Sequence, residues 1–125
     1  MVDNDQIIVL INSGTDAFNA WRAQNPQVSL DLRGLDLHGK DLTGINFSRV
    51  VLEKANLSHA VLNNADLSFA RMKGANLSHA HMKNADLSHS DLRMCLFALA
   101  HLENAVFFFA NLRAADLRGA DLQCA

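Results

Sequence analysis

What the chain lacks narrows its class before any motif is considered. Its two cysteines are too few for a disulfide framework, and no stretch approaches the roughly 20 apolar residues of a membrane-spanning helix. The formal net charge is −2 over 125 residues, so the chain is neither a polyanion nor a nucleic-acid-binding polycation. Asp3 and Asp5 stand where a secretory signal would carry positive charge. We therefore expect a cytoplasmic protein.

Motifs for catalysis and cofactor binding are also missing. The sequence has no glycine-rich phosphate loop, no nucleophile elbow and no His-Glu-x-x-His. Asp66 and Asp86 superficially resemble paired catalytic acids, but the repeat described below places Asp or Asn at such positions throughout. We interpret them as hydrogen-bonding groups near turns, and we predict no catalytic residue, no cofactor and no enzyme activity.

The only proline, Pro26, stands where the sequence pattern changes. Residues 1–25 show no five-residue period, whereas residues 30–124 follow one without interruption. The residue before a proline is disfavoured in a helix, so the amino-terminal part ends here. We predict a helical cap over residues 1–28 and a second, repetitive unit over residues 29–125.

Two short helices are expected within the cap. Apolar residues with helical spacing lie between Ile7 and Ile11, and a glycine follows that can stop the helix. Ser13 or Thr15 can cap a second helix, which places Phe18 and Trp21 on one face. That face is predicted to cover the start of the repetitive unit.

A period of five residues organises the rest of the chain. Neither a helix nor a flat strand keeps every fifth residue on one side, but a coil that turns one corner per repeat does. Four corners close a square coil of 20 residues, and stacked coils pair as parallel strands about 4.8 Å apart. The central, inward residues of the nineteen repeats are Leu32, Leu37, Leu42, Phe47, Leu52, Leu57, Leu62, Leu67, Met72, Leu77, Met82, Leu87, Leu92, Phe97, Leu102, Phe107, Leu112, Leu117 and Leu122.

The turn chemistry agrees with this interpretation. Two places after the central residue, eight repeats carry glycine or asparagine, which tolerate the positive φ of the third position in a type II turn: Gly34, Gly39, Gly44, Asn64, Gly74, Asn84, Asn104 and Gly119. We predict an all-β solenoid of just under five coils. Its core column includes Leu57, Leu67, Leu77, Leu87, Phe97, Phe107 and Leu117.

These repeats resemble the pentapeptide-repeat family, whose motif is Ala-(Asp/Asn)-Leu-x-x. The full motif begins at Ala55, Ala65, Ala75, Ala85, Ala110, Ala115 and Ala120. The resemblance covers residues 30–124 and implies a right-handed quadrilateral parallel β-helix. It also implies one specific function to consider, since some members of the family imitate duplex DNA with an acidic rod and bind type II topoisomerases.

The first coil departs from the motif. Bulkier side chains replace the small alanine, and Lys40 falls at an inward position. We expect a widened first coil beneath the helices, with Lys40 at its mouth beside a carboxylate or in water, because an unpaired buried cation is costly. Cys95 occupies the small inward position and Cys124 lies next to the last residue. We interpret them as a small buried residue and a terminal bystander.

Any function must lie on the outward surface, where residues 20 apart form columns. Outward apolar residues concentrate in the later coils, which is typical of a contact surface; these are Phe69, Met94, Leu96, Leu99, Val106, Phe108 and Phe109. A solenoid also leaves an open backbone edge at its end, and nothing after Ala125 covers it. We therefore predict a homodimer joined through the carboxyl-terminal coils.

Histidines form a second outward cluster. His59 and His79 stack on adjacent coils, as do His81 and His101. Neighbouring histidines can share a metal ion, but zinc sites need converging ligands, and a flat column splays its side chains outward. We predict a solvated surface and no metal.

Two functions are compatible with this sequence. The first is a non-enzymatic protein-interaction scaffold with an unidentified protein partner. The alternative is a DNA mimic that binds gyrase, a type II topoisomerase, and modulates its sensitivity to inhibitors. Basic residues alternate with the acids along the rod, which favours the scaffold. We expect no membrane binding and no direct nucleic-acid binding, because no face gathers a basic stripe with aromatic platforms.

Overall fold

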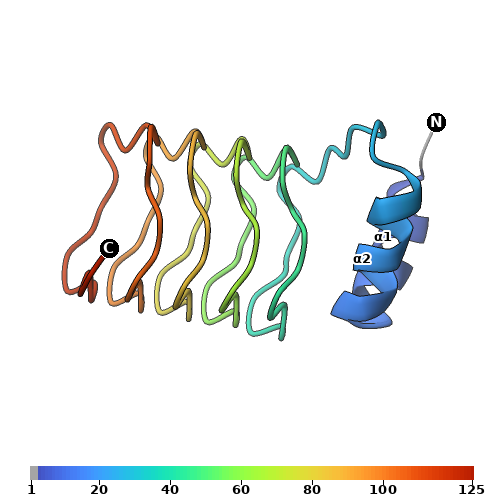
Figure 1. The fold of residues 1–125 in the computed structure, drawn as a ribbon. Helices are drawn as coiled ribbons and strands as arrows, with labels where there is room; N and C mark the ends of the chain where they lie inside the picture. Colours follow the sequence, from blue (N-terminus) through green and yellow to red (C-terminus); the bar gives the residue numbers. More distant parts are fainter. Residues whose placement is uncertain (1–2) are drawn as a thin grey trace.

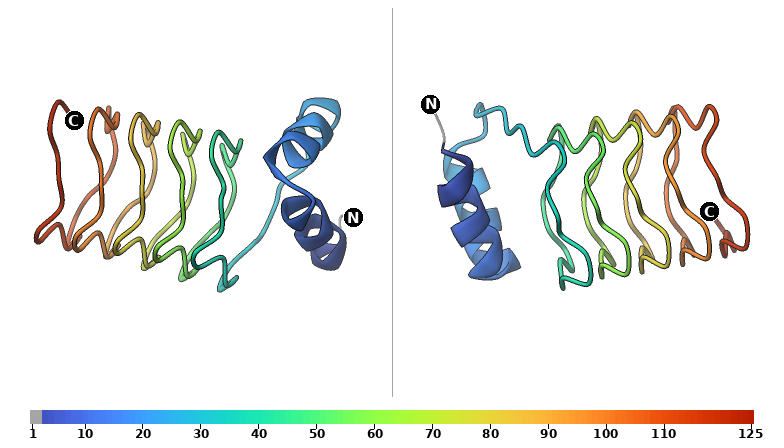
Figure 2. Two further views of the ribbon diagram at one scale, coloured as in Figure 1. Left: turned by 90° about the horizontal axis from the view of Figure 1, so that it is seen from below. Right: turned by 180° about the vertical axis from the view of Figure 1, so that it is seen from behind.

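The computed structural model describes residues 3–125 as two short helices followed by a rod of stacked coils (Figures 1 and 2). Helix α1 spans Asn4–Asn12 and helix α2 spans Thr15–Gln24. Both lie at one end of the rod, and the carboxyl terminus lies at the other. Among residues 3–125, no helix has the length and apolar character needed to cross a bilayer.

The helices begin where local chemistry satisfies their free N–H groups. The Asp3 side chain caps α1 by accepting from the N–H of Asp5 at 2.9 Å. Gly14 precedes α2 with a φ of +111° and gives it no side-chain cap. The expected cap from Ser13 or Thr15 is therefore not formed. The Ser13 hydroxyl instead donates to the Val9 carbonyl at 2.8 Å, at the end of α1.

Within the rod, neighbouring coils are joined by parallel β-bridges between residues that are twenty positions apart. Asp31 pairs with Val51, Val51 with Arg71, and the series continues to the last coil. These are single-residue bridges, and no strand of several residues forms among residues 3–125. The reason is the short period: a turn occupies two of the five residues, so only one residue per side pairs with its neighbours above and below.

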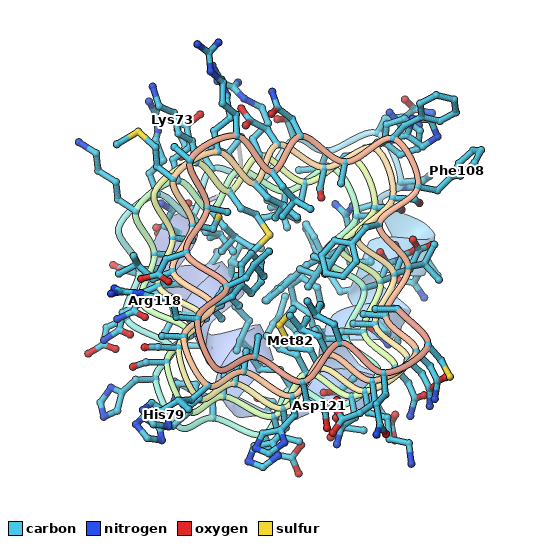
Figure 3. All side chains as sticks on the ribbon, turned by 90° about the vertical axis from the view of Figure 1, so that its left-hand side faces the viewer. Lys73, His79, Met82, Phe108, Arg118 and Asp121 are labelled. Atoms are coloured by element: carbon cyan, nitrogen blue, oxygen red, sulfur yellow. The ribbon has the colours of Figure 1, made fainter. Side chains whose placement is uncertain are left out.

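Seen along its axis, the rod has a square outline (Figure 3). The carboxyl-terminal end faces the viewer, and the chain passes from Arg118 at the left to Asp121 at the bottom while advancing toward the viewer. That is the sense of a right-handed coil.

The central residues fill the interior of the square. Leu57, Leu67, Leu77, Leu87 and Phe97 are fully buried, and burial of each side chain contributes about 1.5–3 kcal/mol. Two residues of the predicted column, Phe107 and Leu117, are only partly buried. They belong to the last coil of residues 3–125, which contacts a neighbouring coil on one side only within that range.

The corners adopt positive φ at ordinary residues as well as at glycine and asparagine. Phe69, His89 and Phe109 have φ of 57–59°, a conformation that costs a non-glycine residue roughly 1–2 kcal/mol. Stacking holds them there: the N–H of Phe69 donates to the Ser88 carbonyl of the next coil at 2.9 Å. Phe69 and His89 are therefore held by the coil that follows them, whereas Phe109 lies in the last coil of the described chain and lacks this bond.

Asp and Asn before the central residue stabilise these turns. The Asp66 carboxylate accepts from the Ser68 N–H at 3.0 Å, and the Asp86 carboxylate accepts from the Ser88 N–H at 2.9 Å. Side-chain acceptors of this kind favour turns by satisfying a backbone donor two residues on. Asp66 and Asp86 thus have the turn-stabilising role that the repeat predicted.

The helices cover the first coil through packing and through polar side chains. Phe18 packs edge-on against Phe47, with ring centroids 5.3 Å apart, while Trp21 is only partly buried. Asn19 donates to the Gly44 carbonyl at 2.9 Å and accepts from the Asn46 N–H at 2.8 Å. An amide side chain thereby pairs with the backbone edge as a neighbouring coil would.

Two cations complete this junction. The Arg22 guanidinium donates to the Ser48 carbonyl at 2.7 Å and to the Val28 carbonyl at 3.3 Å. The Lys40 ammonium donates to the side-chain oxygen of Asn12 at 2.9 Å, so its hydrogen-bond partner is an amide, where a carboxylate or water was expected. The division at residue 28 into a cap and a repetitive unit remains a prediction.

Candidate interaction site

Four aromatic side chains form a ladder along one corner of the rod. We call Phe69, His89, Phe108 and Phe109 the aromatic corner. The rings of Phe69 and His89 stack with centroids 4.6 Å apart and planes 2° apart, and His89 lies 5.2 Å from Phe109. Phe108 meets Phe109 at 4.4 Å in a T-shaped arrangement. The twenty-residue register places Phe69, His89 and Phe109 on successive coils, and Phe108 precedes Phe109 on the last of them.

Arg49 extends the ladder toward the amino-terminal end. Its guanidinium carbon lies 4.5 Å from the centre of the Phe69 ring, within the range of a cation–π contact. At the other end, Phe108 and Phe109 are 64% and 73% exposed. A cluster of exposed aromatic side chains of this kind is typical of a contact surface.

The predicted contact residues do not form one surface. Val106 lies on the same side as Phe108, at the right of Figure 3. Leu96 pairs with Asp116, whose carboxylate binds Arg118 at the left of the same view. Met94 and Leu99 flank Leu96 on that left side. The twenty-residue register, had it been applied to all seven residues, would have separated them in advance.

The last coil presents an incomplete backbone edge, which we call the end face. Inside the rod, the N–H of Leu87 donates to the Val106 carbonyl at 2.7 Å, and the Ala85 carbonyl accepts from the Val106 N–H at 2.9 Å. Within residues 3–125, the equivalent groups of the last coil have no hydrogen-bond partner. They are the N–H groups of Phe107, Phe109, Leu112, Ala114, Leu117, Gly119, Leu122 and Cys124, and the carbonyls of Ala105, Ala110, Ala115 and Ala120.

Apolar side chains accompany these polar groups. Leu112 and Leu117 are partly buried, and Leu122 is 42% exposed. In an inner coil the equivalent leucines are fully buried. The end face therefore combines free donors, free acceptors and accessible leucines.

Both predicted histidine pairs are present. His59 stacks on His79 at 4.6 Å, and His81 stacks on His101 at 4.7 Å, with planes 4° and 6° apart. Parallel rings direct their nitrogens side by side and not toward a shared point. Within residues 3–125, no three potential ligands come together in a way that could hold a metal ion.

The two cysteines differ in environment. Cys95 is buried and its thiol donates to the Met72 carbonyl at 2.9 Å. Burial raises the pKa of Cys95 to about 12, so the thiol stays protonated and unreactive. Cys124 is exposed, and both are free. Cys95 is the small buried residue that its position in the repeat predicted.

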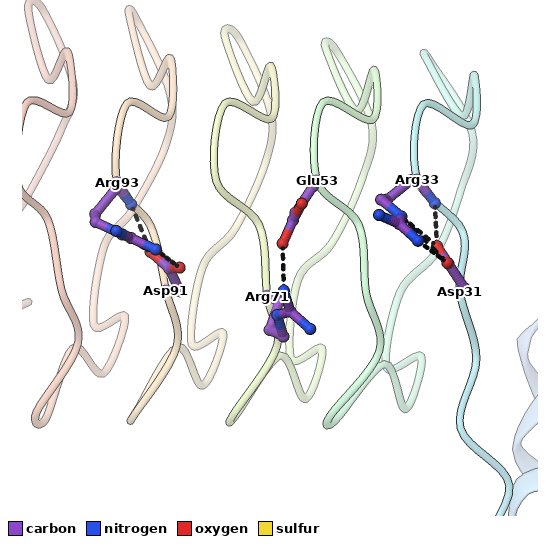
Figure 4. A network of polar contacts seen from close by, with 6 residues as sticks. All are labelled: Asp31, Arg33, Glu53, Arg71, Asp91 and Arg93. Carbon is purple, nitrogen blue, oxygen red and sulfur yellow. Dashed lines mark hydrogen bonds and ion pairs between the residues drawn. The ribbon is translucent and has the colours of Figure 1, made fainter.

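Arginines neutralise several outward carboxylates (Figure 4). Arg93 contacts Asp91 at 2.6 Å, and Arg71 reaches Glu53 on the neighbouring coil at 2.9 Å. Hydrogen bonds from Arg93 hold the pKa of Asp91 below its usual value. This side of the rod therefore lacks the continuous negative row expected of a DNA mimic.

Sequence reasoning missed one charged feature. Lys54, Lys73, Arg93 and Arg113 gather along a single corner, where Lys73, Arg93 and Arg113 stack on successive coils. We call these four residues the basic edge. A basic stripe exists after all, although no aromatic side chain lines it in the described part of the chain. The twenty-residue spacing of Lys73, Arg93 and Arg113 was the signal that could have revealed it.

Comparisons with known proteins agree on the repeat. A family model described as pentapeptide repeats matches with eight copies over residues 31–68, 60–97 and 85–123. No curated protein matches the chain by sequence.

Two solved structures are similar over most of the chain. The first is a pentapeptide repeat protein from the thylakoid lumen of Arabidopsis thaliana, with a TM-score of 0.73 and 30% identity over 78% of this chain and 68% of that one. The second is HetL from the cyanobacterium Nostoc, a protein involved in the regulation of heterocyst differentiation. Its TM-score is 0.64 and its identity 32%, over 76% of this chain and 48% of HetL. This chain therefore spans about half the length of HetL.

Proposed function

This chain belongs to the pentapeptide-repeat family, and from that premise we propose that it is a non-catalytic protein-interaction rod that forms a homodimer through its last coils. One observation carries the proposal: the aromatic corner runs into the end face, so exposed rings and unpaired backbone groups meet at one end of the rod. Buried aromatic side chains are the residues that most often dominate the energy of protein interfaces.

The end face is suited to a second copy of itself. It carries donors and acceptors on the same edge, so a two-fold related copy can supply the missing partner of each kind. An isologous contact of this type closes after two subunits and does not propagate into a fibre. The accessible leucines Leu112, Leu117 and Leu122 would gain the burial that inner leucines already have.

The aromatic corner adds apolar area to the same contact. Phe109, the final ring in the ladder, contacts His89 and Phe108 and still remains 73% exposed. Partner binding there removes aromatic surface from water, and burial of apolar surface contributes about 25 cal/mol per Å². Met94, Leu96 and Leu99, on the other side of the rod, are not needed for this contact.

A cytoplasmic location completes the proposal. Free Cys95 and Cys124 are consistent with it, because cysteines remain reduced in that compartment. The relative from the thylakoid lumen is located elsewhere. Fractionation of the source cells with an antibody against the chain would test the location independently of the dimer.

The dimer is tested by the mass of the protein in solution. We expect residues 1–125 to sediment as a dimer, and the double variant Phe108→Asp/Phe109→Asp to sediment as a monomer at the same concentration. Val9→Asp is the matched control, because Val9 is 64% exposed at the opposite end of the molecule and receives the same kind of change. It should leave the mass unchanged. A wild-type monomer at the highest soluble concentration contradicts the proposal.

A further inference from the structure

We propose that the basic edge binds an acidic amphipathic helix of a partner protein. Lys73, Arg93 and Arg113 occupy the same position in three successive coils. The Gly74 N–H donates to the Arg93 carbonyl at 2.9 Å, and the Met94 N–H donates to the Arg113 carbonyl at 3.0 Å. The three cations therefore rise from the rod at intervals of one coil, about 4.8 Å.

Two shallow hollows make this edge a trough. One, of about 220 Å³, is lined by Lys73, Arg93, Met94, Arg113 and Ala114. The other, of about 420 Å³, is lined by Glu53, Lys54, Lys73, Gly74 and Met94. Because both hollows include Lys73 and Met94, they adjoin along the rod axis. The corner residues Gly74 and Ala114 are small, and Met94, 55% exposed, lies between the two hollows as a shared apolar wall.

The trough carries net positive charge. Within residues 3–125, Lys54, Lys73 and Arg113 form no ion pair, whereas Arg93 is paired with Asp91 and Arg71 with Glu53 (Figure 4). The cations therefore outnumber the neighbouring carboxylates. Charge of one sign gathered along a groove favours a partner of the opposite sign and accelerates its association.

The spacing of the cations selects a helix over an extended peptide. A helix rises 5.4 Å per turn, so carboxylates three or four residues apart recur on one face about every 4.5–6 Å. An extended strand repeats its same-face side chains about every 6.8 Å and loses register with cations about 4.8 Å apart. Apolar residues beside the carboxylates would meet Met94, whose flexible side chain adapts to varied partners.

Single-stranded nucleic acid fits the trough less well. Proteins that bind it usually combine cations with aromatic platforms for base stacking, and both hollows lack aromatic lining residues. The aromatic corner is a separate surface, since Phe108 lies at the right and Lys73 at the upper left of Figure 3. The trough is therefore distinct from the aromatic corner, and it meets the end face only at Arg113 and Ala114.

Fluorescence anisotropy with a labelled helical peptide tests the proposal. The probe has about 18 residues, or five turns, with glutamates at every third or fourth position and leucines beside them. Its comparison is an isomer of identical composition whose glutamates are spread around the helix. We expect the patterned peptide to bind more tightly, and Lys73→Glu/Arg113→Glu to weaken that binding about tenfold or more.

Matched variants make the result specific. Lys83→Glu changes a lysine on another corner of the rod and should leave affinity unchanged. Phe108→Asp/Phe109→Asp should also bind normally, which separates this inference from the dimer. A peptide with lysine in place of glutamate should bind the charge-reversed variant, and such a rescue cannot arise from misfolding.

Four outcomes would overturn the proposal. They are equal affinity for the two peptide isomers, an equal loss in Lys83→Glu, failure of the charge-swapped rescue, and tighter binding of a short single-stranded oligonucleotide than of the patterned peptide. The last outcome would assign the edge to nucleic acid.

Discussion

The two ends of the rod meet the same physical problem differently. A stack of coils leaves unpaired backbone groups and uncovered apolar residues at each end. At the amino-terminal end, Asn19 and Arg22 bind the first coil's backbone while Phe18 covers Phe47. At the other end, the described chain offers no equivalent, and Leu122 remains 42% exposed.

This difference teaches that burial in a solenoid depends on a residue's neighbours along the rod as much as on its own type. Leu77 and Leu117 occupy the same position in the repeat, yet only Leu77 has a coil on both sides. Repeat proteins behave as sums of unit and nearest-neighbour energies. The same substitution should therefore have different effects at different heights in the stack.

The largest expected effect comes from the inner core. Leu77→Ala should lower the free energy of unfolding by about 2–5 kcal/mol, because the cavity is closed on all sides. Leu117→Ala should cost about 1–2 kcal/mol, since its side chain is already partly in water. Urea unfolding in the Phe108→Asp/Phe109→Asp background measures both without a contribution from dimerisation. Equal losses would contradict the nearest-neighbour explanation.

The next effect tests the covered end. Arg22→Met removes the donors to Ser48 and Val28 but keeps most of the apolar stem, and should cost about 1.5–3 kcal/mol. Arg118→Met is the control, because its ion pair with Asp116 is exposed to solvent and such pairs contribute little to stability. If both variants unfold at the same urea concentration, the buried arginine does not hold the cap in place.

The smallest effect concerns the corners at the two ends. Ala114 has a φ of +60° near the end face, so Ala114→Gly should gain about 0.5–1 kcal/mol by relieving backbone strain. Gly44 has a φ of +72° beneath the helices, and an added Cβ would meet no atom within 4 Å. Gly44→Ala should therefore cost about 1–2 kcal/mol through the backbone alone. Thermal unfolding of both variants measures this. If the two substitutions shift the melting temperature in the same direction, backbone strain at the corners does not explain their effects.

Much of the architecture followed from periodicity. Leucine every fifth residue and alanine two places earlier predicted the square coil, and the inner members of the column are buried as expected. The aromatic and histidine stacks also followed, because a twenty-residue register assigns Phe69 to His89 and His59 to His79. Local spacing sufficed in these cases since each coil repeats the last.

Other features were not predicted from the pattern. The sequence places a lysine at an inward position, but only the packed helices bring Asn12 to within 2.9 Å of Lys40. The contact surface was predicted as one patch, although the twenty-residue register itself places Leu96 and Phe108 on opposite sides of the square. Glycine and asparagine predicted some turns, while Arg49 and Met94 adopt the same positive φ without such a preference.

The sequence by itself determined the repeat, the inward column and the family, because a strict five-residue period admits few backbone arrangements. Tertiary structure alone decided which side chains bind the covered end, where hollows form beside the stacked cations and how far each terminal leucine is exposed. Those properties depend on contacts between coils and helices far apart in the chain, which the five-residue pattern does not specify.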